Sequence, residues 1–206
     1  MKLLRPLTLF IIIFLGEIGL FLLFSSFYNP SLASQYGGLT VVYNNLVYEP
    51  YFIVLFSIFL HNLSVATLDF IPLFGLAMLV FSIIETGLVV AINGSIVGTP
   101  GLTISLYLFT LPHSWLELPA YAVASASGIY FIFDASSNGL RKATIRLFYM
   151  YLMVAVELLI AASFEAGEIV DKSYGLLPYL YWIPAIPAFY FLIVFYKYFQ
   201  RLADSS

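Results

Sequence analysis

The chain has 206 residues, of which 62% are hydrophobic and only 9% are charged. Soluble domains carry roughly 25% charged residues to keep their surface hydrated, so this composition excludes a soluble protein. A net charge of −3 without a basic run excludes nucleic-acid binding, and the lack of cysteine excludes thiol redox chemistry. A bilayer-spanning helix uses about 20 apolar residues, so the composition allows up to about six spans.

The hydropathy pattern predicts an all-α protein, a polytopic transmembrane helix bundle that forms one integral membrane domain over residues 1–206. The six spans are expected at about residues 7–27, 51–68, 73–93, 112–133, 145–165 and 178–199. The apolar run 102–133 is too long for one span and is divided by Pro112. We therefore expect a short re-entrant or interfacial helix over residues 102–111.

The segments between the spans contain many turn-forming residues. Residues 29–50 hold Pro, Gly, Asn and Ser but no Lys or Arg, which predicts an extracytoplasmic loop with a short strand or helix around residues 39–43. Asp69 and Pro72 predict a tight turn. Polar loops are expected after residue 93 and over residues 134–146.

The basic residues predict the orientation of the bundle. With six spans, seven of the eight basic residues fall on one side of the membrane, and only Lys172 falls on the other. The seven are Lys2, Arg5, Arg141, Lys142, Arg146, Lys197 and Arg201. Because basic residues concentrate on the cytoplasmic side, both termini are expected in the cytoplasm and the chain is expected in the cell membrane.

Acidic residues, in contrast, fall inside the expected spans. A charged side chain at the centre of a bilayer costs at least about 2.5–3.5 kcal/mol, so these acids need protons, hydrogen bonds or cations. His113 and Glu117 lie four residues apart and so share one helix face. We predict an intramembrane polar cluster biased toward the outer half of the membrane. Its members are Glu85, Glu117, Glu157, Glu165, His61, His113, Asn62 and Asn93.

Such a cluster serves either as interhelical hydrogen-bond glue or as a site that binds a cation, moves protons or docks a ligand. The sequence lacks the HExxH zinc motif. We therefore expect no metal and no cofactor, with His61, His113 and Glu117 as the weaker metal candidates. Successive helical residues point about 100° apart, so Ser114 is not expected to hydrogen-bond to His113, and no catalytic residue is predicted.

Small residues recur at a spacing of four in the fourth span, at Ala120, Ala124 and Gly128. Such rows let helices approach closely. This span is therefore expected to be the central helix of the bundle.

Four segments carry a resemblance to a known family. LPHSWLELPA at 111–120 resembles the "PHG-x-x-E-x-x-A" signature of the stage II sporulation protein M family of integral membrane proteins. FLHNLSVA at 59–66, NGSIVG at 93–98 and AASFEAG at 161–167 resemble further family segments in the same order. The resemblance covers residues 55–167 and marks Asn62, Asn93, Gly94, Pro112, His113, Glu117 and Glu165. The sequence departs from the family pattern at Ser114, His61 and Phe164, where Gly, Asn and Ile are usual.

The resemblance implies a membrane scaffold, because the family's namesake recruits peptidoglycan-degrading partners during engulfment. We therefore expect a non-enzymatic multi-pass protein that anchors other membrane or envelope proteins in the lipid bilayer, with homo-oligomerisation left open. A proton- or cation-coupled transporter that uses the buried Glu and His residues is the alternative. An intramembrane metal-dependent enzyme is the third hypothesis.

Overall fold

The computed structural model describes residues 6–27, 31, 48–171 and 175–205. Its long elements are α1 Pro6–Ser25, α4 Tyr51–Asp69, α5 Gly75–Val97, α6 Gly101–Leu108, α7 Ser114–Asn138, α8 Leu140–Val170 and α9 Trp182–Ser205, with the 3-10 helix η3 Leu177–Tyr181 before α9. Among the described residues, six helices are long and apolar enough to cross a membrane. The all-α fold with six spans is confirmed, and α6 is the short helix expected before the fourth span.

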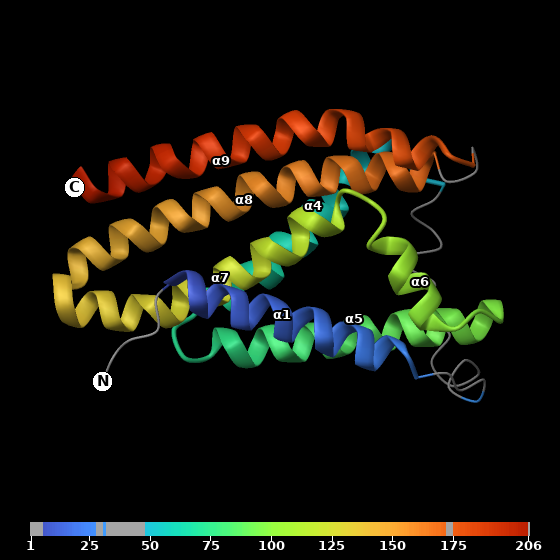
Figure 1. Cartoon of the computed structure of the whole chain (residues 1–206), viewed down its shortest axis with the longest axis horizontal. Coiled ribbons are helices and arrows are strands. Elements are labelled where there is room, and N and C mark those ends of the chain that lie inside the picture. The colour runs from blue at the N-terminus through green and yellow to red at the C-terminus, as the bar shows by residue number, and fades with distance from the viewer. Residues whose placement is uncertain (1–5, 28–30, 32–47, 172–174, 206) are drawn as a thin grey trace.

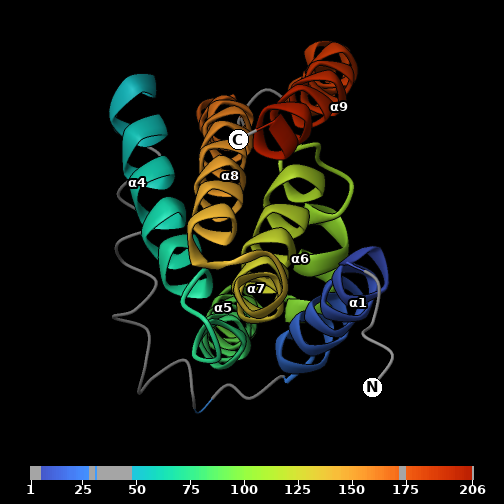
Figure 2. The same ribbon diagram turned by 90° about the vertical axis from the view of Figure 1, so that its left-hand side faces the viewer.

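Helix α7 lies at the centre of the bundle (Figures 1 and 2). It packs against α1, α4, α5 and α8, whereas α9 packs along α8 at the outside. The expected small residues face this interior, since Ala120 and Ala124 are fully buried. At Gly128 a Cβ atom would come within 2.7 Å of the Phe70 carbonyl oxygen, so only glycine permits this approach. The prediction of a central fourth span is therefore confirmed.

Two predicted loops are wrong. The loop expected over residues 134–146 is reduced to Gly139, with φ +89°, because α7 runs on to Asn138 and α8 begins at Leu140. Helix α5 likewise continues past Asn93 to Val97, and Gly98 after it has the left-handed conformation that commonly follows a helix. Polar residues alone did not end these helices, because a helix that leaves the apolar layer can continue in water. The helices end instead just before Gly139 and Gly98.

The tight turn at Asp69 and Pro72 is confirmed. Leu73 has a positive φ of 66°, and a Cβ atom at Gly75 would come within 1.8 Å of the Asp69 carbonyl oxygen. The turn is thus closed too tightly for any residue other than glycine at position 75. The strand or helix expected around residues 39–43 lies outside the described residues.

The start of α1, the α7–α8 connection and the end of α9 all lie at one end of the bundle (Figure 1). The described basic residues belong to these segments: Arg141, Lys142, Arg146, Lys197 and Arg201. Lys2, Arg5 and Lys172 lie outside the described residues. We call this end the terminal end and the opposite one the distal end.

An apolar cleft of about 790 Å³ lies near the terminal end, and residues of α1, α7, α8 and α9 line it. Leu7 and Tyr196 at its rim are exposed. Ala126 and Ser127 belong to its α7 wall. Four spans that pack elsewhere therefore leave a lateral gap here.

Candidate functional site

Four titratable side chains meet where α7 and α8 pack at the distal end. His113 directly precedes α7 and Glu117 lies one turn into it, while Glu165 and Glu168 lie one turn apart near the end of α8. Because the two helices are joined through Gly139 and run antiparallel, His113 lies opposite Glu168. Glu117 likewise lies opposite Glu165. We call these four residues the His–Glu cluster.

The outer pair of the cluster is an ion pair. His113 Nδ1 contacts Glu168 Oε2, and the side chains are only 8% and 3% exposed. The other oxygen, Glu168 Oε1, is buried without a hydrogen-bond partner among the described residues. This pair therefore joins the beginning of α7 to the end of α8 inside the protein.

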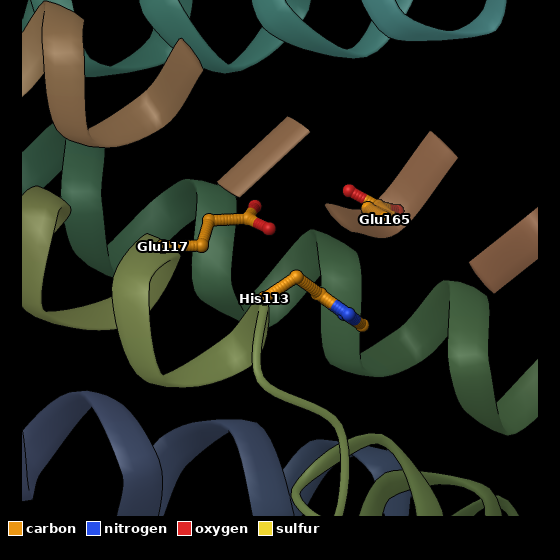
Figure 3. Close-up of side chains that lie close together, drawn as sticks. All are labelled: His113, Glu117 and Glu165. Carbon is orange, nitrogen blue, oxygen red and sulfur yellow. The ribbon is translucent and has the colours of Figure 1, made fainter. Parts of the chain in front are cut away.

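The inner pair lies beside it. A ring nitrogen of His113 and one carboxylate oxygen each of Glu117 and Glu165 lie within 4.8 Å of one another. Figure 3 shows the carboxylates of Glu117 and Glu165 pointing toward each other from facing helices. The Tyr121 hydroxyl donates a 3.0 Å hydrogen bond to Glu117 Oε1. Two acids and one imidazole thus share a single buried space.

The second ring nitrogen of His113 faces away from the acids. Its Nε2 lies 3.2 Å from Ser114 Oγ, and that hydroxyl donates to the Leu108 carbonyl oxygen at 2.9 Å. A hydroxyl has one proton, and a carbonyl oxygen can only accept, so Nε2 must carry the proton that it donates to Ser114. The Nδ1 atom is left facing the carboxylates.

The sequence model of the family described as stage II sporulation protein M matches residues 7–167. The chain belongs to the stage II sporulation protein M family. The match begins well before residue 55, where the resemblance in the sequence begins, and both end at residue 167. No curated protein and no solved structure matched the chain.

Of the residues marked by the family pattern, three lie in the His–Glu cluster: His113, Glu117 and Glu165. Gly94 has a different role, because a Cβ atom there would come within 2.4 Å of the Thr99 carbonyl oxygen in the α5–α6 turn. Asn62 is buried in α4, and its Nδ2 atom has no hydrogen-bond partner among the described residues.

The predicted cluster of eight residues is smaller in the structure. His61 and Glu85 are exposed on α4 and α5, so their inclusion was wrong. Asn93 and Glu157 are half-buried, and neither belongs to the group that contains His113. The spacing of residues along one helix defines which of them share a face. It does not define which face turns toward the neighbouring helices.

One cluster residue and one neighbour of the cluster were missed in the sequence. Glu168 was assigned to a loop, because the fifth span was expected to end at residue 165, yet α8 continues to Val170. The spacing of three between Glu165 and Glu168 was the available signal. Tyr121, four residues after Glu117, was overlooked because tyrosine is common in apolar helices.

The expectation that His113 and Ser114 do not hydrogen-bond was also wrong. That argument considered only the directions of the two Cα–Cβ bonds. An imidazole is long enough to turn back over the neighbouring residue. The resulting order of Ser114, His113 and Glu168 resembles a hydrolase triad, but the proton on Nε2 prevents His113 from accepting one from Ser114.

A second group of acids is buried near the cluster. Glu17 of α1 is 2% exposed and Asp69 of α4 is 0% exposed, and none of their four carboxylate oxygens has a hydrogen-bond partner among the described residues. A carboxyl group so placed is neutral or lies beside a cation, since burying an unpaired charge is too costly. Both residues therefore remain candidates for proton binding.

Proposed function

We propose that this chain is a non-enzymatic anchor that holds other envelope proteins in the cell membrane, with both of its own termini in the cytoplasm. Membership of the stage II sporulation protein M family supports the scaffold role. The orientation is supported by the described basic residues, which belong to segments at the terminal end.

The observation that carries the proposal is the apolar cleft between α1, α7, α8 and α9. Its occupant is a single transmembrane helix of a partner protein. Ala126 and Ser127 present small side chains on the α7 wall, and small residues are what lets a second helix approach closely in lipid. Tyr130, Tyr149 and Tyr196 add aromatic contact area around them.

The hydrogen bonding at the distal end supports a role without catalysis. A serine nucleophile needs a base that can accept its proton. Here the Ser114 proton is directed to the Leu108 carbonyl and the facing nitrogen of His113 is already protonated. Ser114 is also only 8% exposed, so a substrate has little access to it.

Photo-crosslinking in native membranes tests the anchor proposal. A photoreactive amino acid at Tyr130 is expected to crosslink to a discrete membrane protein. Ser127→Leu fills the cleft and should abolish that crosslink. Gly19→Leu is the matched control, because a Cβ atom at this exposed position meets nothing within 4 Å. Crosslinking to lipid alone, or a protein crosslink that survives Ser127→Leu, would contradict the proposal.

A proton- or cation-coupled transporter is the second candidate, and the buried acids Glu17 and Asp69 favour it. Unpaired acids inside a membrane protein commonly mark proton or ion pathways. The chain reconstituted into vesicles should then show solute or ion flux driven by an acid gradient, and Glu17→Gln should reduce that flux. Vesicles without acid-dependent flux across a panel of ions and small solutes would remove this candidate.

A further inference from the structure

We propose that the His–Glu cluster binds one divalent transition-metal ion, such as Mn²⁺ or Zn²⁺, between α7 and α8. Its ligands are a ring nitrogen of His113 and one carboxylate oxygen each of Glu117 and Glu165, with Glu168 beside them. The inference does not depend on the anchor role. It also departs from the sequence, which predicted no metal and offered His61 as a weaker ligand; His61 is exposed on another helix.

The first support is geometric. One nitrogen and two oxygens from His113, Glu117 and Glu165 already lie within 4.8 Å of one another. A small divalent cation with ligands at about 2.1 Å holds opposite ligands about 4.2 Å apart. The three groups therefore reach a common ion through small side-chain rotations, without movement of the helices.

The second support is the balance of charge. The cluster contains three carboxyl groups but only one basic side chain, and His113 and Glu168 are among its most buried members. A protonated His113 carries one positive charge against these three carboxyl groups, and the Tyr121 hydroxyl donates to Glu117. Carboxyl groups that face each other in a buried site need a shared proton or added positive charge. One divalent cation supplies that charge at the point where the groups converge.

The third support is the orientation of the His113 ring. Ser114 and the Leu108 carbonyl hold a proton on Nε2, so Nδ1 is the ring nitrogen on the side of the carboxylates. Nδ1 shares a proton with Glu168 in the ion pair, and a metal ion would take the place of that proton. A histidine ligand whose other nitrogen donates to a neighbouring group is the usual arrangement around protein-bound metals.

Glu168 supplies an independent observation. It is 4% exposed, and its Oε1 atom has no hydrogen-bond partner among the described residues although its Oε2 atom contacts His113. A buried carboxylate oxygen without a hydrogen-bond partner is able to bind a cation. A cation bound beside His113 would give Oε1 the partner that it lacks.

The ligand set indicates the class of metal. Carboxylates suit Mg²⁺, Ca²⁺ and Mn²⁺, whereas imidazole suits Zn²⁺, iron, nickel and copper. A mixed set with one nitrogen and several oxygens therefore favours the ions accepted by both kinds of ligand. Mg²⁺ and Ca²⁺ should bind much more weakly, because neither gains from a nitrogen ligand.

The experiment is a Mn²⁺ titration of the purified full chain in detergent, in which the electron paramagnetic resonance signal of free Mn²⁺ reports binding. Wild type should bind one Mn²⁺ per chain, and Zn²⁺ should displace it. Glu165→Gln should weaken binding at least tenfold, with His113→Gln as the second test. Glu157→Gln is the matched control, because it removes a carboxylate from the same helix outside the cluster.

Circular dichroism and gel filtration identify variants that keep the fold, and Glu117→Gln replaces any variant that does not. Loss of Mn²⁺ in a folded cluster variant, with normal binding in Glu157→Gln, supports the metal site. A wild-type chain that binds neither Mn²⁺ nor Zn²⁺ would overturn it, as would equal binding by wild type and the cluster variants. Crosslinking at Tyr130 in the same variants reports the anchor role separately.

Discussion

The two ends of the α7–α8 pair are held together by different chemistry. Near the terminal end, Arg146 of α8 donates a 2.7 Å hydrogen bond to Asp134 of α7, and Asn138 donates to the same oxygen at 2.6 Å. The Arg146 side chain is 36% exposed, so water reaches this pair. At the distal end the His113–Glu168 pair is buried, and two more acids lie beside it.

The difference lies in how charge is balanced. The terminal pair matches one permanent cation with one carboxylate, and water reaches the Arg146 side of the pair. The cluster at the distal end matches three carboxyl groups with one imidazole where little water enters. An exposed ion pair contributes little to stability, whereas a buried group that loses its partner costs several kcal/mol. The two ends should therefore respond very differently to the loss of a charge.

His113→Leu should have the largest effect. It removes the basic side chain of the cluster and leaves the facing carboxyl groups unmatched, so the free energy of unfolding should fall by about 3–5 kcal/mol. An SDS titration in detergent, followed by the fluorescence of Trp115 and Trp182, measures the change. A loss below about 1 kcal/mol would show that the acids do not depend on His113.

Glu168→Gln should come next. The amide oxygen can still accept from Nδ1 but the charge is lost, so we expect a decrease of about 1–3 kcal/mol in the same titration. Glu49→Gln is the control, since Glu49 is exposed and its replacement should leave the unfolding curve unchanged. Equal effects at both positions would argue against a special environment for Glu168.

Ser114→Ala should cost about 1 kcal/mol, because it removes the hydroxyl between the His113 ring and the Leu108 carbonyl. Its more informative effect is on the ring itself. Nitrogen NMR of labelled histidine should show a protonated Nε2 in wild type and a changed Nε2 signal in Ser114→Ala. An unchanged Nε2 signal in the variant would mean that Ser114 does not control it.

Arg146→Ala should have the smallest effect, a loss below about 1 kcal/mol that shrinks further at high salt. The reason is the exposure of the Arg146 side chain, which lets water replace part of its bond to Asp134. Unfolding curves at low and high ionic strength test this. A loss as large as that of His113→Leu would erase the distinction between the two ends.

The sequence predicted the parts of the structure that depend on local patterns. Hydropathy located the six spans, the spacing of four placed His113 and Glu117 on one face, and the small residues identified the central helix. These features repeat at the period of the helix, so they can be recognised in one segment at a time. Glu165 was included because it is an acid at the end of an expected span, and the family pattern marked it as well.

The features that were missed depend on contacts between segments. His61 and Glu85 were included because they are polar and lie within spans, but the rotation of α4 and α5 against their neighbours leaves them exposed. Glu168 was excluded because hydropathy falls before the helix ends. Neighbouring elements, among them η3, bury this end of α8. Tyr181 of η3 lies so close to Gly167 that a Cβ atom at position 167 would come within 2.2 Å of the Tyr181 hydroxyl.

The single-residue connection at Gly139 has a consequence for how this protein can evolve. Helices α7 and α8 contain 25 and 31 residues, and they meet again at the His–Glu cluster after about 37 Å of helix. Because the connection is a single residue, it cannot absorb a change in helix length. The lengths of the two helices therefore determine which residues face each other at the distal end. One inserted residue in either helix would rotate everything beyond it by about 100° and separate Glu117 from Glu165. The lengths of α7 and α8 therefore set which residues meet at the cluster. Relatives that keep the cluster should tolerate substitutions along both helices far better than insertions or deletions in them.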